Sequence, residues 1–438
     1  MKWISSLKRS KEKSMKERIK QTIREMEQEI IELGEDLFSH PELGFKEFES
    51  KKKIMAALEK NGIHVEKEYF ETGFEVSIGN GNGPVIGLIA ELDAIVTQGH
   101  PQADPNTQAA HSCGHSVQGT VMCAALIALK RSGVLDALDG TVKVFFTPAE
   151  EFCDMEYRQQ LVEQGKIEYY SGKENMLAAG VFDDCDVLLS VHVMGESKYD
   201  YSVNSTLAGF TFKRITFLGK AAHAAVIPHL GVNALNAFTL FQSAVGMLRE
   251  TFVDEDKVRI HGMVTEGGQS VNSIPAQVTY ECYVRSVNPT TIQTLDKQLE
   301  KTAYHCAAAL NAEVKIENIP GYYPLVQSGP VNDRVLANVL DYATHDKIYF
   351  NEVSMAAGDI GDISLFKPII QLGIGGTVGR VHGDSFRISD TSKVYIEPAM
   401  IMAQTVIDLL VDSEGTKRIA EEYPITMTKE EYIDSLKH

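Results

Sequence analysis

The sequence predicts an α/β protein: a domain with a mixed β-sheet flanked by helices, interrupted by a smaller, ferredoxin-like α+β domain. Three observations support this fold class. At 438 residues the chain exceeds the size of one ordinary hydrophobic core. In the first two hundred residues, nearly all-apolar segments typical of buried strands alternate with segments of helical periodicity. From residue 207 onward the expected strands instead alternate apolar and polar residues, which indicates a second architecture.

The larger domain is predicted to begin with two helices. Apolar residues recur at helical spacing over residues 15–37, and this helix ends at His40-Pro41 because the residue before a proline avoids the helical conformation. The second helix ends at Gly62, since glycine commonly follows a helix. The other elements expected in this domain are strands at residues 65–69, 74–78, 85–92, 142–146, 187–191 and 369–373, and helices at residues 48–61, 117–130, 331–342 and 396–411.

Residues 207–321 are predicted to form the inserted domain. Their elements follow the order strand, helix, strand, strand, helix, strand, which is the order of a ferredoxin-like sandwich. The larger domain is then built from residues 15–206 and 322–430. The expected strands of the inserted domain are residues 210–218, 258–265, 277–287 and 312–317, and its helices are residues 233–249 and 290–310.

Composition disfavours two classes of partner. The net charge is −18 at pH 7, so no basic stripe is available to neutralise nucleic-acid phosphates. No apolar run is expected to be long enough to span a bilayer, and the basic first twenty residues lack the apolar segment of a signal peptide. The six cysteines have no CxxC spacing, which indicates a reducing compartment. We therefore predict a cytoplasmic protein that contacts neither nucleic acid nor membrane.

Candidate metal ligands follow the predicted strands. Cys113 and His115 flank a single glycine, which lets both side chains turn toward one point. The adjacent carboxylates Glu150 and Glu151 follow one buried strand, and His192 follows another. Because α/β sheets place their sites at such strand ends, these side chains are expected to converge.

The residue types indicate a pair of divalent cations. His382, on a later glycine-rich loop, completes a set of thiolate, imidazole and carboxylate ligands that suits zinc or manganese. Glu150 remains to act as a base toward a shared water, and Asp93 is placed to orient a histidine ligand. Taken singly, each residue has an ordinary interpretation as a core histidine, a buried cysteine or a solvated carboxylate. In this combination they favour a dinuclear metal site.

The chain resembles the aminoacylase and carboxypeptidase G superfamily of dinuclear metallopeptidases. Within it, the chain is similar to the amidohydrolase branch, which includes aminobenzoyl-glutamate hydrolases, indole-acetyl-amino-acid hydrolases and hippurate hydrolases. The resemblance extends from about residue 40 to the last predicted helix. It is carried by His40-Pro41-Glu42-Leu43-Gly44-Phe45, Ala90-Glu91-Leu92-Asp93-Ala94, His111-Ser112-Cys113-Gly114-His115, Pro148-Ala149-Glu150-Glu151, Gly219-Lys220-Ala221-Ala222-His223, Val271-Asn272-Ser273-Ile274-Pro275 and Gly358-Asp359-Ile360-Gly361-Asp362.

The resemblance implies a role for each matching residue. Glu150 would be the general base and acid, and His223, on the inserted lid or dimerisation domain, would polarise the scissile carbonyl. Asn272 and Arg285 would bind the substrate; a turn residue and an exposed strand charge are nearly equal alternatives for these two. The implied metal ligands are Cys113, His115, Glu151, His192 and His382.

The implied activity is hydrolysis of the amide bond of N-acyl or N-aroyl amino acids, or of small dipeptides, by water activated on two divalent ions, manganese or zinc. The resemblance also implies a homodimer formed through the inserted domain, or pairing with a homologous partner subunit. The chain departs from the family pattern at Ser116, where aspartate or asparagine is usual, and at Gln118, where many members have histidine. We expect these two replacements to affect which substrate and which metal the protein prefers more than the reaction that it catalyses.

Two other hypotheses remain open. In one, Cys113 is the nucleophile of a cysteine enzyme, which leaves Glu150, Glu151 and His382 without roles. In the other, the chain is a non-catalytic or partner-dependent metal-binding subunit of a hydrolase complex. The presence of Glu150 argues against that second alternative, since a binding protein does not need a base.

Overall fold

The computed structural model describes residues 2–437, which form two compact units. The first consists of the residues up to Ser205, with Val326–Glu352 and Ile363–Thr426, and the second of Thr206–Leu325, Val353–Asp362 and the residues from Met427 onward. The predicted boundaries placed residue 206 and residues 322–325, 353–362 and 427–430 with the larger domain. They belong to the second unit because the carboxylate of Asp362 accepts hydrogen bonds from the backbone N–H of Tyr323 (2.6 Å) and from the hydroxyl of Tyr432 (2.8 Å).

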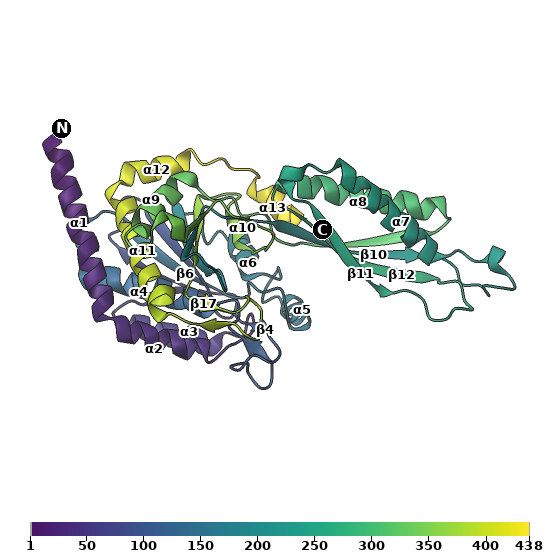
Figure 1. The fold of residues 1–438 in the computed structure, drawn as a ribbon, viewed down its shortest axis with the longest axis horizontal. Helices are drawn as coiled ribbons and strands as arrows, with labels where there is room; N and C mark the ends of the chain where they lie inside the picture. The colour runs from purple at the N-terminus through teal and green to yellow at the C-terminus, as the bar shows by residue number, and fades with distance from the viewer. Residues whose placement is uncertain (1, 438) are drawn as a thin grey trace. The chain divides into compact units, whose positions relative to one another are not determined.

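The first unit is built on an eight-stranded mixed sheet in the order β1-β2-β6-β3-β7-β16-β8-β14 (Figure 1). Its centre, β6-β3-β7-β16, is parallel, whereas β1, β2 and β8 join by antiparallel pairing. The central strands are parallel and nearly all apolar because helices cover the sheet. The strands are β1 (Val65–Tyr69), β2 (Gly73–Gly79), β3 (Val85–Glu91), β6 (Thr141–Thr147), β7 (Val187–Val193), β8 (Tyr201–Val203), β14 (Ile348–Phe350) and β16 (Ile369–Ile374).

Helix α4 (His115–Ser132) is the central helix of this unit and is buried along almost its whole length. It packs against β3 and β7 on one side and against α1, α2 and α11 on the other. The single helix predicted over residues 15–37 is two helices, because the chain turns at Met26 between them. The remaining helices of this unit are α1 (Lys2–Glu25), α2 (Glu27–Phe38), α3 (Phe48–Glu59), α5 (Met155–Glu163), α6 (Gly172–Ala178), α9 (Gly329–Val339), α11 (Glu397–Val411) and α12 (Ser413–Glu421). Of the short helix α10 (Ile360–Ile363), all residues but the last belong to the second unit.

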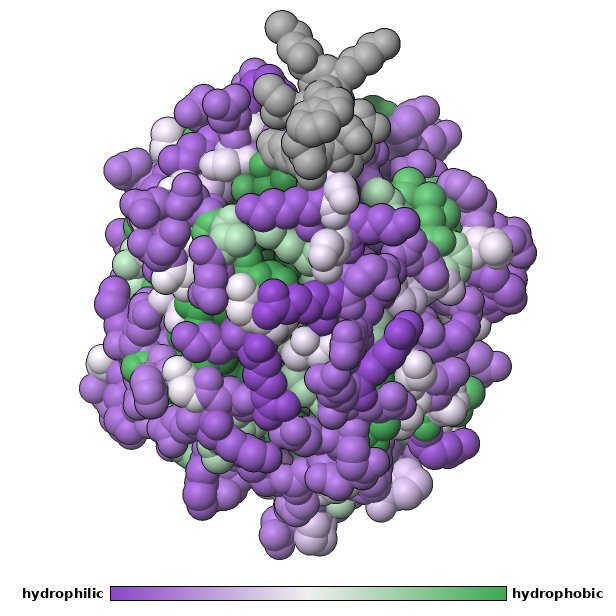
Figure 2. Space-filling view, turned by 90° about the vertical axis from the view of Figure 1, so that its left-hand side faces the viewer, coloured by the Kyte–Doolittle hydropathy of each residue, from purple (hydrophilic) through white to green (hydrophobic). Residues whose placement is uncertain are grey.

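One helical segment, Ser392–Val411, is long and apolar enough to cross a membrane, contrary to the sequence-based expectation. However, 83% of it is buried within the protein, as in the core helix of a globular domain. Its apolar residues, such as Ile401 and Val406, belong to the hydrophobic core beneath the sheet. The face of the molecule in Figure 2 is mainly hydrophilic, with hydrophobic side chains scattered over it.

The second unit has a four-stranded antiparallel sheet in the order β11-β12-β10-β13, covered by α7 and α8. This order and the alternation of strands and helices are those of the predicted ferredoxin-like sandwich. The unit has its own core, which includes Phe217, Phe241 and Leu299. Its elements are β10 (Gly209–Leu218), α7 (Ala234–Leu248), β11 (Arg259–Glu266), β12 (Gln277–Ser286), α8 (Pro289–Ala309), β13 (Glu313–Ile319), the short strands β9 (Thr206–Leu207) and β15 (Val353–Ser354), and α13 (Lys429–Ser435).

Two further short hairpins belong to the first unit and lie in its loops. The strands are β4 (Ile95–Val96) with β5 (Ala109–Ala110), and β17 (Thr377–Val378) with β18 (Arg387–Ile388). The first pair leads the chain into Ser112 and the second supports the loop of His382, whose backbone N–H donates to the carbonyl oxygen of Ser112 (3.0 Å). A backbone hydrogen bond therefore connects the loop before α4 with the loop of His382, and both loops carry candidate ligands.

Candidate active site

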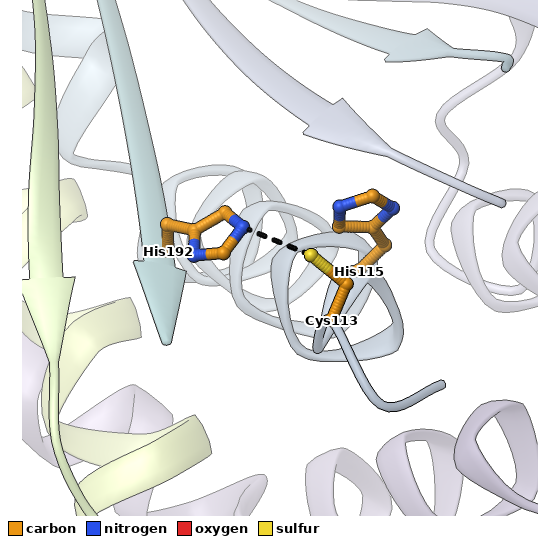
Figure 3. A group of neighbouring side chains, drawn as sticks. All are labelled: Cys113, His115 and His192. Atoms are coloured by element: carbon orange, nitrogen blue, oxygen red, sulfur yellow. Dashed lines mark hydrogen bonds between the residues drawn. The ribbon is translucent and has the colours of Figure 1, made fainter. Parts of the chain in front are cut away.

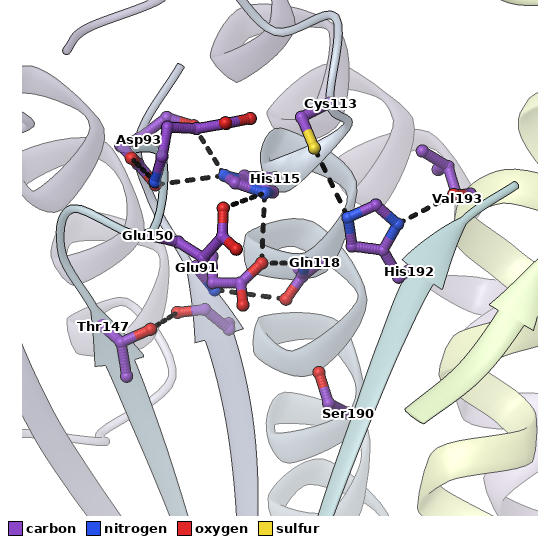
Figure 4. A network of polar contacts seen from close by, with 12 residues as sticks. Glu91, Asp93, Cys113, His115, Gln118, Thr147, Glu150, Ser190, His192 and Val193 are labelled. Atoms are coloured by element: carbon purple, nitrogen blue, oxygen red, sulfur yellow. Dashed lines mark hydrogen bonds and ion pairs between the residues drawn. The ribbon is translucent and has the colours of Figure 1, made fainter. Parts of the chain in front are cut away.

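Several candidate residues of the first unit lie at the carboxyl ends of its parallel strands (Figure 4). Glu91 is the last residue of β3, and Asp93 follows it. Glu150 and Glu151 follow β6, and His192 is the penultimate residue of β7. Parallel strands end at the same edge of a sheet, so residues that are far apart in the chain lie next to one another here.

The loop before α4 supplies Cys113, and the first residue of α4 is His115 (Figure 3). Between them, Gly114 has φ of +85°, a left-handed conformation that side chains disfavour. A Cβ at this position would overlap Cγ2 of Val193, so the loop packs directly on the end of β7. Glycine is therefore required here both by conformation and by space, and it brings the cysteine and the histidine to one place.

The ligand atoms form three overlapping groups in which all atoms lie within 4.8 Å of one another: Cys113, His115 and His192; Cys113, Glu151 and His382; and His115, Glu150 and Glu151. Individual distances are 3.4 Å from Cys113 Sγ to His192 Nε2, 3.1 Å from His382 Nε2 to Glu151 Oε1, and 3.8 Å from His115 Nε2 to Glu150 Oε2. The six side chains named in the sequence analysis as ligands or base thus converge. His382 is the most open of them, with 48% of its side chain exposed.

Asp93 orients His115. His115 Nδ1 lies 3.0 Å from both the carbonyl oxygen and Oδ1 of Asp93, and both of these atoms can only accept. Nδ1 therefore carries a proton, and Nε2 is the ring nitrogen that remains for another partner. The other carboxylate oxygen of Asp93 accepts from the backbone N–H of Glu151 (2.9 Å). Asp93 thus links the histidine to the carboxylate loop.

The site holds an excess of buried negative charge. Burial alone would raise the pKa of Glu91, but Lys173 and His115 outweigh it and lower the pKa to about 2. Burial likewise opposes ionisation of Asp93, but the hydrogen bond from His115 lowers its pKa to about 2. Burial and the neighbouring Glu151 raise the pKa of the Cys113 thiol well above its usual value. Such a cysteine needs an adjacent cation to become a thiolate, which disfavours it as a nucleophile by itself.

These residues fit divalent cations. His115 Nε2 is buried and makes no hydrogen bond to the described residues, while carboxylate oxygens of Glu91 and Glu150 face it. Buried carboxylates gathered around one nitrogen need a positive charge among them, which a divalent cation would supply. Sulfur, imidazole and carboxylate donors are also the set that suits zinc or manganese.

Two fully buried basic residues support the site and were missed by the sequence analysis. Arg158 of α5 donates to the backbone carbonyl oxygen of Glu151 and, at 2.6 Å, to that of Tyr170. Lys173 of α6 forms an ion pair with Glu91 (2.7 Å). Neither short helix was predicted, so no sequence signal connected these residues with the strand ends.

The His40-Pro41-Glu42-Leu43-Gly44-Phe45 motif packs beneath the site and provides no ligand. The carbonyl oxygen of Glu42 accepts from the backbone N–H of Ala94 (2.7 Å). A Cβ on Gly44 would lie 2.8 Å from Cα of Ala149, which immediately precedes the two glutamates. A few residues on, Glu47 accepts from the backbone N–H of Ala149 (2.9 Å). The motif therefore fixes the loops that follow β3 and β6.

The two residues that depart from the family pattern, Gln118 and Ser116, have different surroundings. Gln118 donates to Oε2 of Glu91 (2.5 Å) and accepts from its backbone N–H (3.3 Å), so it orients that carboxylate. Ser116 is buried, and its hydroxyl has no hydrogen-bond partner among the described residues. Gln118 thus has a defined structural role, and nothing in the structure explains Ser116.

His223 and Asn272 lie on the second unit. His223 is exposed, and its Nδ1 accepts from the backbone N–H groups of Ala225 (3.3 Å) and Val226 (3.2 Å). Its Nε2 therefore carries the proton and can donate it in a hydrogen bond. The backbone carbonyl of Asn272 accepts from the N–H of Ala224 (2.9 Å), which ties the loop of Asn272 to that of His223.

Arg285, also on the second unit, is partly buried and not the exposed strand charge of the alternative interpretation. Its guanidinium lies over the rings of Phe210 (5.2 Å) and Tyr283 (5.3 Å), and it donates to the carbonyl oxygen of Met355 (3.1 Å). Burial lowers its pKa. Its stacking and its hydrogen bond hold it within its own unit.

Comparisons of the sequence and of the structure with known proteins agree on one family of peptidases. A sequence profile of peptidase family M20/M25/M40 matches residues 87–406. One subunit of the p-aminobenzoyl-glutamate hydrolase of Escherichia coli is 33% identical over 299 residues, which cover 66% of this chain but only 57% of that protein. A putative aminohydrolase of methicillin-resistant Staphylococcus aureus has a similar structure, with a TM-score of 0.78 at 22% identity over 90% of this chain and 99% of the other. A dinuclear metal-binding peptidase of family M20 from Bacillus subtilis has a TM-score of 0.70 at 22% identity, over 88% and 99% of the two chains.

Proposed function

The chain belongs to peptidase family M20/M25/M40, and from this premise we propose that it hydrolyses the amide bond of N-acyl or N-aroyl amino acids, or of small dipeptides, with the help of two divalent cations. The observation that carries the proposal is the convergence of six sulfur, imidazole and carboxylate side chains at one sheet edge. The relative named as a hydrolase of p-aminobenzoyl-glutamate, an N-aroyl amino acid, supports the substrate class.

Cys113, His115, Glu151, His192 and His382 would hold the cations. Cys113, His115 and Glu151 each belong to two of the three groups of ligand atoms, which suits two neighbouring ions rather than one. When bound, manganese or zinc would lower the pKa of a water molecule and polarise the substrate carbonyl. The donor types suit both metals, so the choice between them is left to measurement.

The protein's own residues would then move the proton. Glu150 follows the same strand as Glu151 but points toward His115, so it lies beside the ligands and remains available as a base. It would accept a proton from the attacking water and deliver it to the departing amine, which leaves its own protonation state unchanged over the cycle. His223, with its proton on Nε2, would donate a hydrogen bond to the oxygen of the scissile carbonyl as negative charge develops there.

We also propose that the chain forms a homodimer through the second unit. Helix α7 buries one face against its sheet through Ala237, Phe241 and Val245, while its exposed face carries large apolar side chains among small polar ones. Leu240 and Met247 on that face are 40% and 72% exposed. Large apolar side chains exposed on one helix suit self-association about a two-fold axis. Pairing with a homologous chain is the alternative, favoured because the Escherichia coli relative is named as one subunit of its enzyme.

The proposed activity is tested by amine release from a panel of N-acyl amino acids, aroyl-glutamates and dipeptides. We expect cleavage with added manganese or zinc, loss of cleavage after chelation, and its return when metal is restored. Cleavage that survives chelation would instead favour Cys113 as nucleophile. Metal binding without cleavage of any compound would favour a non-catalytic or partner-dependent subunit.

A further inference from the structure

Lys173 is a buried lysine beside the candidate active site. It is the second residue of α6, which begins with a capping box at Ser171. Lys173 Nζ lies 2.7 Å from Glu91 Oε1, and the two side chains are 0% and 2% exposed. Removing two charges from water is costly, so a buried pair stabilises a fold poorly compared with apolar side chains of similar size. The pair therefore calls for an explanation beyond folding.

The other oxygen of Glu91 faces the metal ligands (Figure 4). Glu91 Oε2 lies 3.1 Å from His115 Nε2 and accepts a hydrogen bond from Gln118 (2.5 Å). Because Asp93 occupies Nδ1 of His115, Nε2 is the nitrogen that remains for a cation. Glu91 is therefore on the metal-facing side of His115, together with Glu150.

Both oxygens of Glu91 are held in place. Lys173 fixes Oε1, and Gln118 fixes Oε2 while leaving it directed at His115. Charge also favours the arrangement, because the carboxylates around His115 outnumber the two buried basic residues, Lys173 and Arg158. Without Lys173, Glu91 would be a further uncompensated negative charge in this pocket before any cation enters.

We infer that Glu91 and Lys173 belong to the metal site: Glu91 supplies an additional carboxylate oxygen to the cation on His115 Nε2, and Lys173 positions that carboxylate and balances its charge. This inference rests on the proposed dinuclear site and extends its set of residues. Lys173 acts only through Glu91, so it is a positioning residue rather than a catalytic one.

The inference is tested by calorimetric titration of the metal-free protein with Mn²⁺. We expect the wild type to bind two ions per chain. Glu91→Gln keeps the shape of the side chain but removes its charge, and should weaken the binding of one ion at least tenfold. Lys173→Met should weaken the same ion to a similar extent. The double variant should bind no more weakly than Glu91→Gln, because Lys173 has no separate effect on the ion.

A second buried lysine serves as the matched control. Lys213, in the second unit, is also fully buried and forms ion pairs with Asp296 (2.7 Å) and Glu300 (2.8 Å). Lys213→Met should lower the melting temperature and leave both Mn²⁺ dissociation constants unchanged. If Lys173→Met does not fold, Glu91→Gln and the double variant, which leaves no lone buried charge, provide the same comparison.

The outcomes separate the inference from the proposed function. Two ions bound with wild-type affinity by Glu91→Gln and by the double variant would overturn the inference and leave the metal site standing. A double variant that binds one ion at least tenfold more weakly than Glu91→Gln would overturn the role given to Lys173. Absence of Mn²⁺ binding by the wild type would overturn the proposed metal site and the inference with it.

Discussion

Glu150 and Glu151 are neighbours in sequence but have different surroundings. The carbonyl oxygen of Glu151 accepts from Arg158, and its carboxylate lies 3.1 Å from His382. Glu150 instead faces His115 at 3.8 Å. Ala149, with φ of +54°, begins the turn that directs the two side chains to different partners. The tandem glutamates are thus distinguished by their contacts, which their order in the sequence does not reveal.

The proposed base is tested by Glu150→Gln. The amide keeps the size of the side chain but cannot accept a proton, so kcat should fall on the order of 10²–10⁴-fold. Metal content, measured by elemental analysis, should remain that of the wild type because Glu151 is intact. Activity within a few-fold of the wild type would rule out Glu150 as the base.

Glu47 is a buried acid whose pKa is raised. Burial, reinforced by the negative charge of Asp93, raises the pKa of Glu47 from 4.5 to about 8. The folded state therefore binds this proton more tightly than the unfolded state does. Its contribution to stability is complete below pH 4.5 and is lost as the pH rises toward 8.

Glu47→Gln should remove this pH dependence. The variant resembles the protonated acid and can still accept from the N–H of Ala149. At pH 5 its free energy of unfolding should be close to that of the wild type. Between pH 5 and pH 8 the wild type should lose stability relative to the variant by at most about 1.4 kcal/mol per pH unit. Denaturant unfolding at several pH values measures this difference, and parallel curves for the two proteins would contradict the raised pKa.

At the scale of elements, long periodic segments were predicted well and short helices were missed. Residues 290–310 were expected to be helical and α8 spans Pro289–Ala309; residues 396–411 were expected and α11 spans Glu397–Val411. Helices α5 and α6 have seven to nine residues, too few for a periodic pattern to be recognised. They carry Arg158 and Lys173, so the missed elements are also the ones that support the site.

Gly114→Ala tests whether the site requires glycine immediately before α4. The new Cβ would meet Val193 in a left-handed backbone conformation, so we expect destabilisation of about 1–3 kcal/mol and weaker metal binding. Gly62→Ala is the control, because Gly62 also has positive φ but has open space around its Cα. It should lower stability and leave metal affinity unchanged. Equal effects of the two variants on metal affinity would show that close packing on Val193 is unimportant.

At the scale of the whole molecule, the cations are expected to stabilise the fold. Their proposed ligands come from β6, β7, α4 and the loop after β17, and unfolding would separate them. A ligand at one hundred times its dissociation constant stabilises the folded state by about 2.7 kcal/mol per site. Chelation should therefore lower the melting temperature measured by calorimetry, and added manganese or zinc should restore it. A melting temperature that chelation leaves unchanged would contradict the metal site.

Self-association is tested on the open face of α7. Met247→Glu places a charge on that face, and light scattering should show a shift from dimer to monomer. Ile425→Glu is the control, since Ile425 is 66% exposed but lies in the first unit. It should leave the mass of the particle unchanged. A wild type that is monomeric, or a Met247→Glu variant that remains dimeric, would exclude α7 as the interface.

The fold class, the inserted ferredoxin-like unit, the family and the residues proposed as ligands could all be predicted from the sequence. Periodicity and local motifs are sufficient for these predictions. Buried strands, amphipathic helices and closely spaced ligands can each be recognised from a few neighbouring residues. The contacts between these residues could be seen only in the folded protein: Asp93 with Nδ1 of His115, Glu151 with His382, and Lys173 with Glu91. The residues of the last pair are 82 positions apart in the sequence, and Lys173 lies on a helix that was not predicted. Contacts of this kind depend on strands that end at a common edge of the sheet. No local sequence pattern indicates which distant charged residue will neutralise a buried carboxylate.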